Sequence, residues 1–590
     1  MLIIRYALPI AAALLLILFF SGLPALQCCA LPDDAPAGRA DRRVTRRDAA
    51  FMLLLTAVYA VPAFHALGDT AAPVSFAPMA GESAVLTLES DAVPARLMLY
   101  PGVGMGGYTI EYAADGADYV PVLDFSQGHI EVLKWAELYP ETQLAPRLVR
   151  ITCTSGNPWL GELVLLDEAG EPIPVRSSIP ELCDEQDTVP AAQSFMNSTY
   201  FDEIYHARTA WEHLHGVWPY EISHPPLGKL IMSLGITLFG MTPFGWRFMG
   251  TLFGALMLPV LYVFLKKLFG GAAAPTLGTI LLASDFMHFT QTRIATIDTY
   301  AVFFILLMYL CMYLYLHEES LPALAMSGVF FGLGAASKWT CVYAGAGLAV
   351  LWAGHWLLRA RRGETRGLFT AFLRNCLFCL LFFVLIPGLI YYLSYIPYGQ
   401  AGGARPFSAA YTRIVLDNQS FMFNYHVGVV AEHPYSSRWY QWILDIRPIL
   451  YYLDYYDDGT RSSICAFTNP ALCWGGLLSL FVLLYTAIFR RDRKAAFILV
   501  AYLAQLVPWM FIRRLTFAYH YFPASAFLVL ALCYVFSLMR DNRRSWPVYA
   551  VPFTAASLLL FVLFFPALSG SPVDNAQATA LMRWLPTWPL

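Results

Sequence analysis

Long apolar runs recur along most of this chain and predict helices that cross a membrane. They lie near residues 2–26, 49–67, 244–265, 271–289, 297–316, 322–337, 339–358, 368–395, 470–490, 494–512, 520–539 and 546–567. A helix needs about 20 apolar residues to cross the hydrocarbon core of a bilayer. The pattern therefore predicts an all-α polytopic membrane protein with about 12 transmembrane helices.

Residues 70–190 follow a different pattern, in which apolar and polar positions alternate. The fragment YTIEYA from Tyr108 alternates in this way, and so does LVRITC from Leu148. A period of two residues is typical of strands with one buried face, and turn signals such as Asp115-Gly116 separate them. This stretch predicts an antiparallel β-sandwich inserted among the helices.

The alternation of these patterns divides the chain into segments. The first apolar run could be a signal peptide, because an apolar core follows Arg5, or it could be a membrane helix. The basic stretch RADRRVTRR at residues 39–47 favours a helix, since basic loops stay in the cytoplasm. The predicted segments are two N-terminal helices with a basic cytoplasmic loop (1–67), the β-sandwich (68–190), a first outer loop with an acidic motif (191–243), transmembrane helices (244–395), a long outer loop (396–469), and C-terminal helices with a tail (470–590).

Composition and charge support this picture. The chain is 58% hydrophobic and only 13% charged, whereas a soluble domain carries about 25% charged residues. A net charge of −3 gives no reason to expect a nucleic-acid partner. Basic clusters fall at alternate connections, and the positive-inside rule then places residues 191–243, residues 396–469 and the C-terminus outside. These clusters are Lys266-Lys267, Arg359 to Arg366, Arg490 to Lys494 and Arg540 to Arg544.

The 11 cysteines show neither CxxC pairs nor the Cys/His spacing of a structural zinc site. Cys153 and Cys183 both fall in the segment predicted to lie outside the membrane. A disulfide between them and two free thiols are both compatible with this placement.

The stretch YFDEIYHARTAWEHLHGVWPYEISHPPLGK at residues 200–229 gathers acids, histidines and aromatic residues. Thr199 is suited to cap a helix that begins there, and Gly216 is suited to end it. Asp202 lies three residues after Thr199, so it either closes a capping box or takes part in chemistry.

Other polar residues accompany Asp202. His206 follows it by one helical turn on the same face, and Arg208 and Glu212 have the spacing of an i,i+4 pair. These neighbouring polar residues favour a chemical role for Asp202, although a role as a helix cap is not excluded.

Lysine and arginine residues recur near the outer ends of the predicted spans. Lys229 follows the two prolines of SHPPLGK, where it either extends its amine to the interface or binds an anionic headgroup. Ionisable residues near or within spans are candidates for function, although each alone could be an interfacial anchor. The further residues of this kind are Arg247, Arg293, Asp298, Lys338, Arg513, Arg514 and His520.

Several motifs resemble the protein O-mannosyltransferases, which are polyprenyl- or dolichyl-phosphate-mannose dependent membrane glycosyltransferases with a GT-C fold. The matching pieces are YFDEIYHARTAWE, SHPPLGK, WRFMGTLFG, TRIATIDTY, GAASKWT, HPYSSRWYQWILDIRPILYY and RRLTFAYHYFP, in the family's order. The chain departs from the family in its extra N-terminal helix and its β-rich insert, and it lacks room for the MIR domain of eukaryotic members. This resemblance indicates the bacterial type. The insert itself resembles discoidin or galactose-binding-like domains, which implies carbohydrate binding or a structural role.

The resemblance to the mannosyltransferases implies an inverting transfer of a mannosyl group from a lipid phosphate to a Ser or Thr hydroxyl. Asp202 would be the general base, with Glu203 beside it. The donor phosphate and sugar would be bound by cationic residues, and two histidines would lie on the acceptor side. The first set is Lys229, Arg247, Arg293, Lys338, Arg514 and His520, and the second is His206 and His224.

The same resemblance sets the expected partners. These are a polyprenyl-phosphate-linked sugar, membrane lipid, and exported proteins that arrive through the secretion translocon, while a dimer stays open. Neither a cofactor nor a metal is expected, because the spacing of Asp202, Glu203, His206 and His224 fits no standard ligand motif. The expected location is the cell membrane, with the catalytic loops and the β-sandwich outside.

Two alternatives remain. A transferase of the same fold would add a polyprenyl-phosphate-linked sugar to lipid or cell-wall glycan, which the insert could recognise. A transporter or flippase would use intramembrane charges as a pathway, but such proteins often contain repeated halves. No internal repeat is evident here, and the charged residues gather at the outer ends of the spans.

Overall fold

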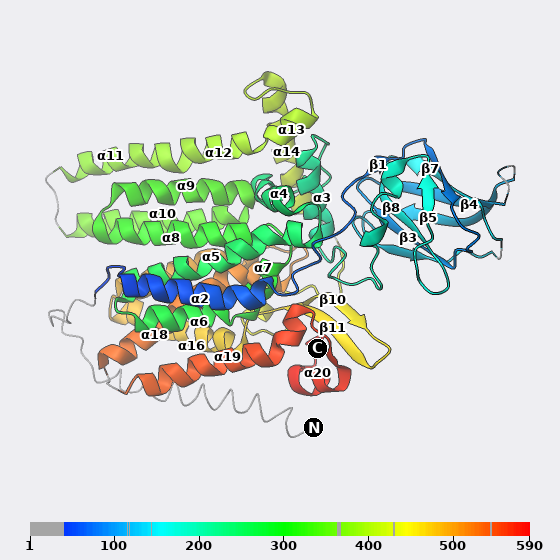
Figure 1. Cartoon of the computed structure of the whole chain (residues 1–590). Coiled ribbons are helices and arrows are strands. Elements are labelled where there is room, and N and C mark those ends of the chain that lie inside the picture. The colour runs from blue at the N-terminus through cyan, green and yellow to red at the C-terminus, as the bar shows by residue number, and fades with distance from the viewer. Residues whose placement is uncertain are drawn as a thin grey trace. The chain divides into compact units, whose positions relative to one another are not determined.

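The computed structural model describes residues 41–590 except 115, 117, 143, 363–366, 429, 430, 543 and 544. The predicted first span at residues 2–26 therefore lies outside the described residues. The chain forms two compact units (Figure 1). The helical unit comprises the residues up to His65, Ile222–Gly228 and Gly250–Leu590, and the mixed unit comprises Ala66–Glu221 and Lys229–Met249.

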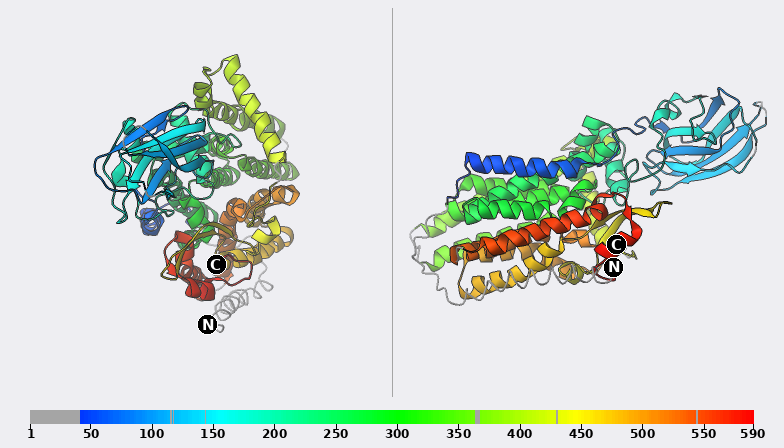
Figure 2. Two further views of the ribbon diagram at one scale, coloured as in Figure 1. Left: turned by 90° about the vertical axis from the view of Figure 1, so that its right-hand side faces the viewer. Right: turned by 60° about the horizontal axis from the view of Figure 1, so that its bottom comes forward.

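The helical unit is built of long helices that run alongside one another (Figure 2). Its first part contains α2 (Arg46–Phe64), most of α5 (Pro243–Phe269), α6 (Ala273–Ala283), α7 (Phe286–Arg293), α8 (Asp298–Glu318), α9 (Leu321–Ser337), α10 (Thr340–Arg361), and α11 (Leu368–Leu380), which a π-helical turn joins to α12 (Ile386–Ser394). Its second part contains α13 (Ile396–Ala401), α14 (Ala409–Gly428), α15 (Trp439–Trp442), β10 (Ile449–Tyr455), β11 (Thr460–Ala466), α16 (Pro470–Phe489), α17 (Arg493–Phe511), η5 (Ala518–Tyr521), α18 (Phe522–Asn542), α19 (Pro547–Ser569), β12 (Val573–Asp574) and α20 (Asn575–Met582).

Nine helices of the described residues are long and apolar enough to cross a membrane. Three shorter apolar helices accompany them: α4 (Leu227–Phe239), α6 and α9. Helix α18 is buried along its whole apolar length and packs against α6, α8, α16 and α17. The prediction of a polytopic helical membrane protein is confirmed, whereas the predicted number of spans is not established.

The single span predicted at residues 271–289 is wrong in one respect, because two helices occupy it. Helix α6 ends at Ala283, and Asp285 then caps α7 by accepting the N–H of His288 at 3.2 Å. The other oxygen of Asp285 accepts the N–H of Asn469 at 2.9 Å. Aspartate favours a helix start over a helix interior, so the chain breaks here although both sides are apolar.

The mixed unit contains two antiparallel sheets followed by two helices. One sheet has the strand order β1-β8-β3-β6 and the other has the order β5-β4-β7-β2-β9. The strands are β1 (Ala77–Pro78), β2 (Ser83–Leu88), β3 (Arg96–Pro101), β4 (Gly106–Ala113), β5 (Val120–Gln127), β6 (Ala136–Leu138), β7 (Leu148–Gly156), β8 (Trp159–Leu166) and β9 (Val175–Ser177), and the helices are α3 (Glu203–Leu214) and α4.

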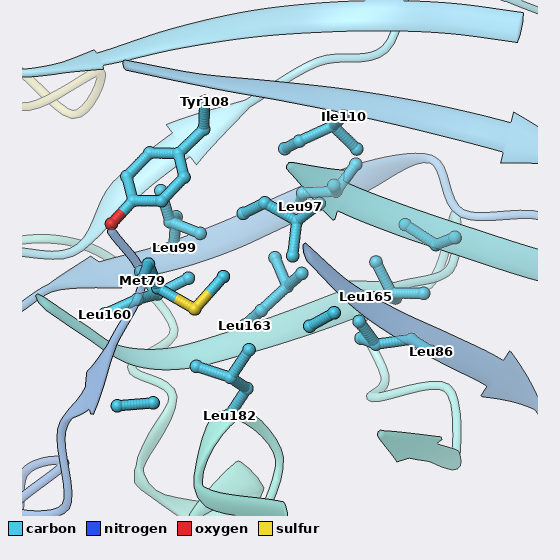
Figure 3. Close-up of a cluster of buried hydrophobic side chains, with 14 of the residues drawn as sticks. Met79, Leu86, Leu97, Leu99, Tyr108, Ile110, Leu160, Leu163, Leu165 and Leu182 are labelled. Carbon is cyan, nitrogen blue, oxygen red and sulfur yellow. The ribbon is translucent and has the colours of Figure 1, made fainter. Parts of the chain in front are cut away.

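The core between the sheets follows from the alternation in the sequence. Strands β4 and β7 pair so that Tyr108, Ile110 and Tyr112 lie opposite Cys153, Ile151 and Val149, and all six side chains are buried. The opposing sheet contributes Leu97, Leu99, Leu160, Leu163 and Leu165 (Figure 3). The prediction of a β-rich insert is confirmed. Cys153 and Cys183 are both free thiols.

Candidate functional site

Helix α3 carries the acidic motif, and it begins later than predicted. Thr199 is not its N-cap, because its N–H donates to the carbonyl of Leu133 at 3.1 Å and its hydroxyl to that of Val132 at 3.0 Å. Asp202 holds the N-cap position, but its side chain makes no capping hydrogen bond. The helix ends before Gly216, which has a φ of 65° as expected of a terminating glycine. The capping box considered for Asp202 is therefore not formed.

The backbone directly before Asp202 is strained. Phe201 has a φ of 49°, in the left-handed region that a bulky residue rarely adopts. Leu133, which accepts the hydrogen bond from Thr199, also has a positive φ of 58°. Such conformations cost about 1–3 kcal/mol each and persist where surrounding contacts enforce them, often at functional sites.

The contact that enforces this geometry is a buried ion pair between Glu203 and Arg247. The Nε and Nη2 atoms of Arg247 donate to the two carboxylate oxygens of Glu203 at 2.8 and 2.7 Å. The remaining donors bind the carbonyls of Leu67, Phe195 and Ser198 at 2.7 to 2.9 Å. A guanidinium has five N–H donors, and all five are engaged. This geometry does not favour the phosphate-binding role predicted for Arg247.

The two neighbouring acids thus have different surroundings. Glu203 is completely buried and paired, whereas Asp202 is only partly buried. The pair of Glu203 and Arg247 fixes the turn that leads into α3. Glu203 therefore holds the start of the helix in place, and Asp202 is the more exposed of the two acids.

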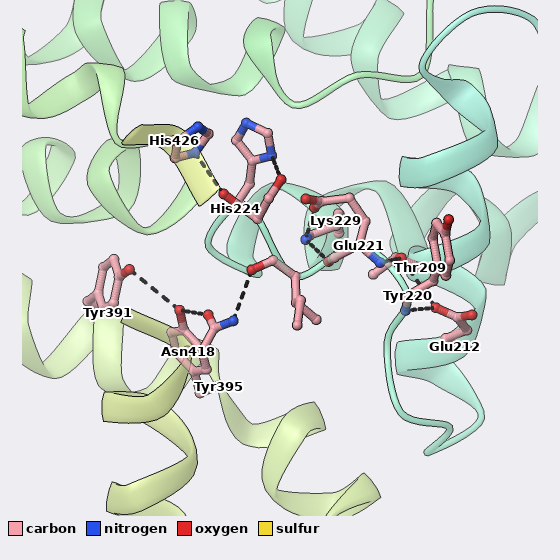
Figure 4. A network of polar contacts seen from close by, with 12 residues as sticks. Thr209, Glu212, Tyr220, Glu221, His224, Lys229, Tyr391, Tyr395, Asn418 and His426 are labelled. Atoms are coloured by element: carbon pink, nitrogen blue, oxygen red, sulfur yellow. Dashed lines mark hydrogen bonds and ion pairs between the residues drawn. The ribbon is translucent and has the colours of Figure 1, made fainter. Parts of the chain in front are cut away.

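The rest of α3 is tied to the loop that follows it (Figure 4). The predicted pair of Arg208 and Glu212 is present at 2.7 Å, and Glu212 also accepts the N–H of Tyr220 at 2.6 Å. The hydroxyl oxygen of Thr209 accepts the N–H of Glu221 at 3.0 Å. Burial raises the pKa of Glu212, while its Arg208 partner opposes that shift. These bonds hold the loop against the helix.

Lys229 is fully buried and pairs with Glu221. Its amine donates to the carboxylate at 2.5 Å and to the carbonyl of the same residue at 2.7 Å. It therefore does not extend to the interface. Burial lowers the pKa of nearby His213 to about 3, and the charge of Lys229 acts in the same direction, so that imidazole is neutral. Sequence reasoning missed Glu221 because no local spacing connects it with Lys229.

In the helical unit, Lys338 and Arg293 also have partners. The amine of Lys338 donates to both oxygens of Asp298 at 2.7 and 2.8 Å. Arg293, the last residue of α7, donates to the carbonyl of His65 at 2.9 Å and lies over the ring of Phe289.

The helical unit brings several predicted residues together around His426, which sequence reasoning missed. Burial, with smaller contributions from the charges of His224, Arg514 and Lys338, lowers the pKa of His426 to about 4. The rings of His224 and His426 lie 5.3 Å apart, and the Nε2 atom of His426 is 2.9 Å from the carbonyl oxygen of Ser223 (Figure 4). No quoted motif contains His426, so only the length of the outer loop could have drawn attention to it.

His520 joins the same group through aromatic contacts. Its ring stacks on Tyr519 at 4.5 Å, and the amine of Lys338 lies 5.6 Å from the centre of the Tyr519 ring. We call His224, Lys338, His426, Arg514 and His520 the cation cluster. It contains four of the residues predicted from the sequence.

A set of three carboxylates with the spacing of a metal site lies in the β-rich insert. The ligand atoms of Glu162, Asp184 and Glu185 are within 4.8 Å of one another. Burial raises the pKa of Glu162 to about 7. Protein donors already bind these acids, because Ser75 donates to Asp184 and Glu185, and Gln186 donates to Glu162. None of the predicted site residues belongs to this set.

Comparisons with known proteins identify the family. The family model described as dolichyl-phosphate-mannose-protein mannosyltransferase matches residues 223–399. The model of the C-terminal four-transmembrane region of protein O-mannosyltransferase matches residues 412–588. Both matches lie outside the β-rich insert, so its resemblance to discoidin-like domains stays a prediction.

Individual relatives agree with these matches. The polyprenol-phosphate-mannose–protein mannosyltransferase of Mycobacterium tuberculosis is 26% identical over 459 residues, which cover 66% of this chain and 86% of that protein. The enzyme of the same name from Corynebacterium glutamicum is 25% identical over 464 residues, covering 66% and 88%. The S. cerevisiae Pmt1–Pmt2 complex, solved with its sugar donor, shares the fold with a TM-score of 0.58 at 13% identity, over 66% of this chain and 89% of that one. The chain belongs to the protein O-mannosyltransferase family.

Proposed function

We propose that this chain is an inverting glycosyltransferase that moves a mannosyl group from a polyprenyl phosphate to Ser or Thr hydroxyls of exported proteins. The names of the mycobacterial and corynebacterial relatives support both the donor and the acceptor class. The basic clusters at alternate helix connections support a reaction on the outer face of the membrane. Exported polypeptides would arrive there from the secretion translocon.

The contrast between Asp202 and Glu203 carries the assignment of the base. A hydroxyl is a weak nucleophile, so a carboxylate must accept its proton as the new bond forms, which typically accelerates a reaction roughly 100- to 10,000-fold. Glu203 is unsuited because Arg247 holds both of its oxygens. Asp202 is partly exposed at the start of a helix that this pair holds in place.

In the proposed reaction, the acceptor oxygen attacks the anomeric carbon of the sugar from the side opposite the phosphate. The bond between that carbon and the phosphate oxygen breaks, and the phosphate leaves with the electron pair while Asp202 takes the proton. The leaving phosphate needs fixed positive charge and no general acid. We assign this role to Lys338, Arg514 and His520 of the cation cluster, above all to Arg514, and we place His206 and His224 on the acceptor side.

The substitution Asp202→Asn tests the base, because it keeps the shape of the side chain and removes its basicity. We expect turnover to fall at least a hundredfold with purified protein, polyprenyl-phosphate mannose and a Ser/Thr peptide. Asp187→Asn, which changes an exposed acid of the same unit, is the matched control and should keep full activity. Wild-type turnover in the Asp202→Asn protein would remove Asp202 from this role.

The same assay distinguishes the acceptor classes. Labelled sugar should enter the peptide and leave it upon β-elimination, as an O-linked sugar does. Label that enters only lipid or wall glycan in membranes would favour the alternative transferase, for which the β-rich insert is the relevant feature.

A further inference from the structure

A polar pocket of about 800 Å³ lies in the helical unit, and arginines dominate its wall. Arg438, Arg447, Arg513 and Arg514 all line it, together with Tyr440, Gln441, Ser436 and Thr516. Glu432 is the only carboxylate residue in the lining. We call this site the arginine pocket.

Its charge is not balanced by the protein. Among the described residues, no carboxylate lies within ion-pair distance of any of these arginines. By contrast, the buried cations Arg247, Lys229 and Lys338 each have a carboxylate partner. Like charges around one cavity repel each other, and a bound anion would relieve this repulsion.

The pocket is held in shape by bonds between its two walls. The N–H of Ser437 donates to the carbonyl of Thr516 at 2.8 Å, and the Thr516 hydroxyl donates back to the carbonyl of Ser437 at 2.6 Å. Arg438 donates to the carbonyl of Arg513 at 2.9 Å, and Arg447 to the carbonyl of Pro434 at 2.7 Å. Arg438 and Arg447 each use one N–H group for these bonds, and the other N–H groups of each guanidinium can bind a ligand.

The position of the pocket along the chain indicates where its ligand comes from. Helix α17, a candidate membrane span, ends at Phe511, whose side chain is 78% exposed. Arg513 and Arg514 follow within three residues, and the exposed aromatic ring of Tyr440 is also in the lining. Aromatic and basic residues at the end of a span are typical of the headgroup layer.

We propose that the arginine pocket binds the phosphate headgroup of an anionic membrane phospholipid, beside the proposed donor-phosphate site with which it shares Arg514. Arginine side chains stay charged at every physiological pH, so the pocket attracts an anion at all times. Phospholipid headgroups are always present at the membrane surface, whereas a donor occupies its site only during turnover. Arginine suits this ligand because its planar donors bind phosphate oxygens in pairs.

The test uses the full-length protein in nanodiscs of phosphatidylcholine, to which phosphatidylglycerol, polyprenyl phosphate or inorganic phosphate is added in separate arms. Bound lipid is counted by native mass spectrometry. The pocket variant is Arg438→Gln/Arg447→Gln/Arg513→Gln, and it leaves Arg514 in place because that residue belongs to the cation cluster. The control Arg405→Gln/Arg413→Gln/Arg490→Gln removes three exposed arginines that do not line the pocket.

We expect the wild-type and control proteins to retain phosphatidylglycerol, and the pocket variant to bind it on the order of a hundredfold more weakly. Binding in the wild type should also weaken as salt is raised. If the triple variant does not fold, the single variant Arg513→Gln replaces it in the same test. Arg513 is exposed and contributes only its backbone carbonyl to the bonds between the walls. Equal binding by pocket variant and control would overturn the proposal. The proposal would also be overturned if the pocket variant lost binding of polyprenyl phosphate or inorganic phosphate alone. The same holds if an acidic acceptor peptide displaced phosphatidylglycerol from the wild-type protein.

Discussion

Asp202 and Glu203 are adjacent and carry the same functional group, yet their surroundings give them different roles. A carboxylate whose two oxygens are held by one guanidinium cannot serve as a base without breaking that pair. Its partner Arg247 is completely buried as well, at 0% exposure. The motif therefore combines one buried acid that fixes the backbone with one acid that is only partly buried.

This division predicts different effects on stability. Glu203→Gln should lower the stability of the mixed unit by about 3–5 kcal/mol, because it leaves the Arg247 charge buried without its partner. The double variant Glu203→Leu/Arg247→Met should be less destabilised than Glu203→Gln, since no unpaired charge remains. The measurement is the thermal unfolding midpoint in detergent.

The exposed pair of Arg176 and Glu89 is the control for this experiment. The side chain of Arg176 is 84% exposed, so Arg176→Gln should change stability by less than about 1 kcal/mol. Asp202→Asn should also leave the unfolding midpoint near the wild-type value. A Glu203→Gln protein as stable as the wild type would show that the pair does not hold the helix.

Sequence alone predicted the local pair and missed the distant ones. Arg208 and Glu212 were expected to meet because four residues separate them on one helix, and they do. Glu203 and Arg247 are 44 positions apart, with most of α3, all of α4 and a proline-containing loop between them, so no spacing rule relates the two charges. For that reason Arg247 was assigned to the donor phosphate although the fold gives it a carboxylate.

At the scale of elements, α3 is attached to the β-rich insert along most of its length. The ring of Trp211 packs edge-on against Phe76 at 5.5 Å and Trp159 at 5.6 Å. The ring of Tyr205 stacks on His129 at 6.2 Å, in the loop after β5. Together with the bonds of Thr199 described above, these contacts make the insert a support for the helix that carries Asp202.

Trp211→Ala should therefore reduce transfer activity although Trp211 is not a proposed catalytic residue. The substitution removes the contacts of α3 with Phe76 and Trp159, so α3 should exchange its amide hydrogens faster in hydrogen-exchange mass spectrometry. We expect at least a tenfold loss of turnover with normal membrane insertion, since small displacements of catalytic groups cost about this much or more. Tyr139→Ala, an aromatic side chain of the same unit that is 62% exposed, should change neither quantity. Unchanged exchange in α3 would contradict the supporting role.

The sequence predicted the positions of strands and helices better than it predicted the breaks between helices. A strict period of two marked β4 and β7, because one face of each strand packs in a core. The break between α6 and α7 was not visible, since only Ser284 and Asp285 separate the apolar end of α6 from Phe286 and Met287. Asp285 also accepts a hydrogen bond from the N–H of Asn469, which lies far away in the sequence.

At the scale of the whole molecule, the proposed reaction requires one orientation in the membrane. The basic clusters predict that the β-rich insert lies outside and the connection around Arg490 inside. In intact cells, a membrane-impermeant maleimide should label Ser83→Cys and should not label Arg490→Cys, both measured against the wild-type background. Both positions are exposed. The reverse labelling would place the acidic motif on the wrong side for a translocated donor.

Most of the buried ion pairs among the described residues share an order along the chain, and Arg208 with Glu212 is the exception. In four of them the carboxylate precedes the cation: Asp48 with Lys266, Glu203 with Arg247, Glu221 with Lys229, and Asp298 with Lys338. Chains are made from the N-terminus, so each of these cations leaves the ribosome after its counter-charge. In each of these pairs the carboxylate is therefore already part of the growing chain when its cation is synthesised.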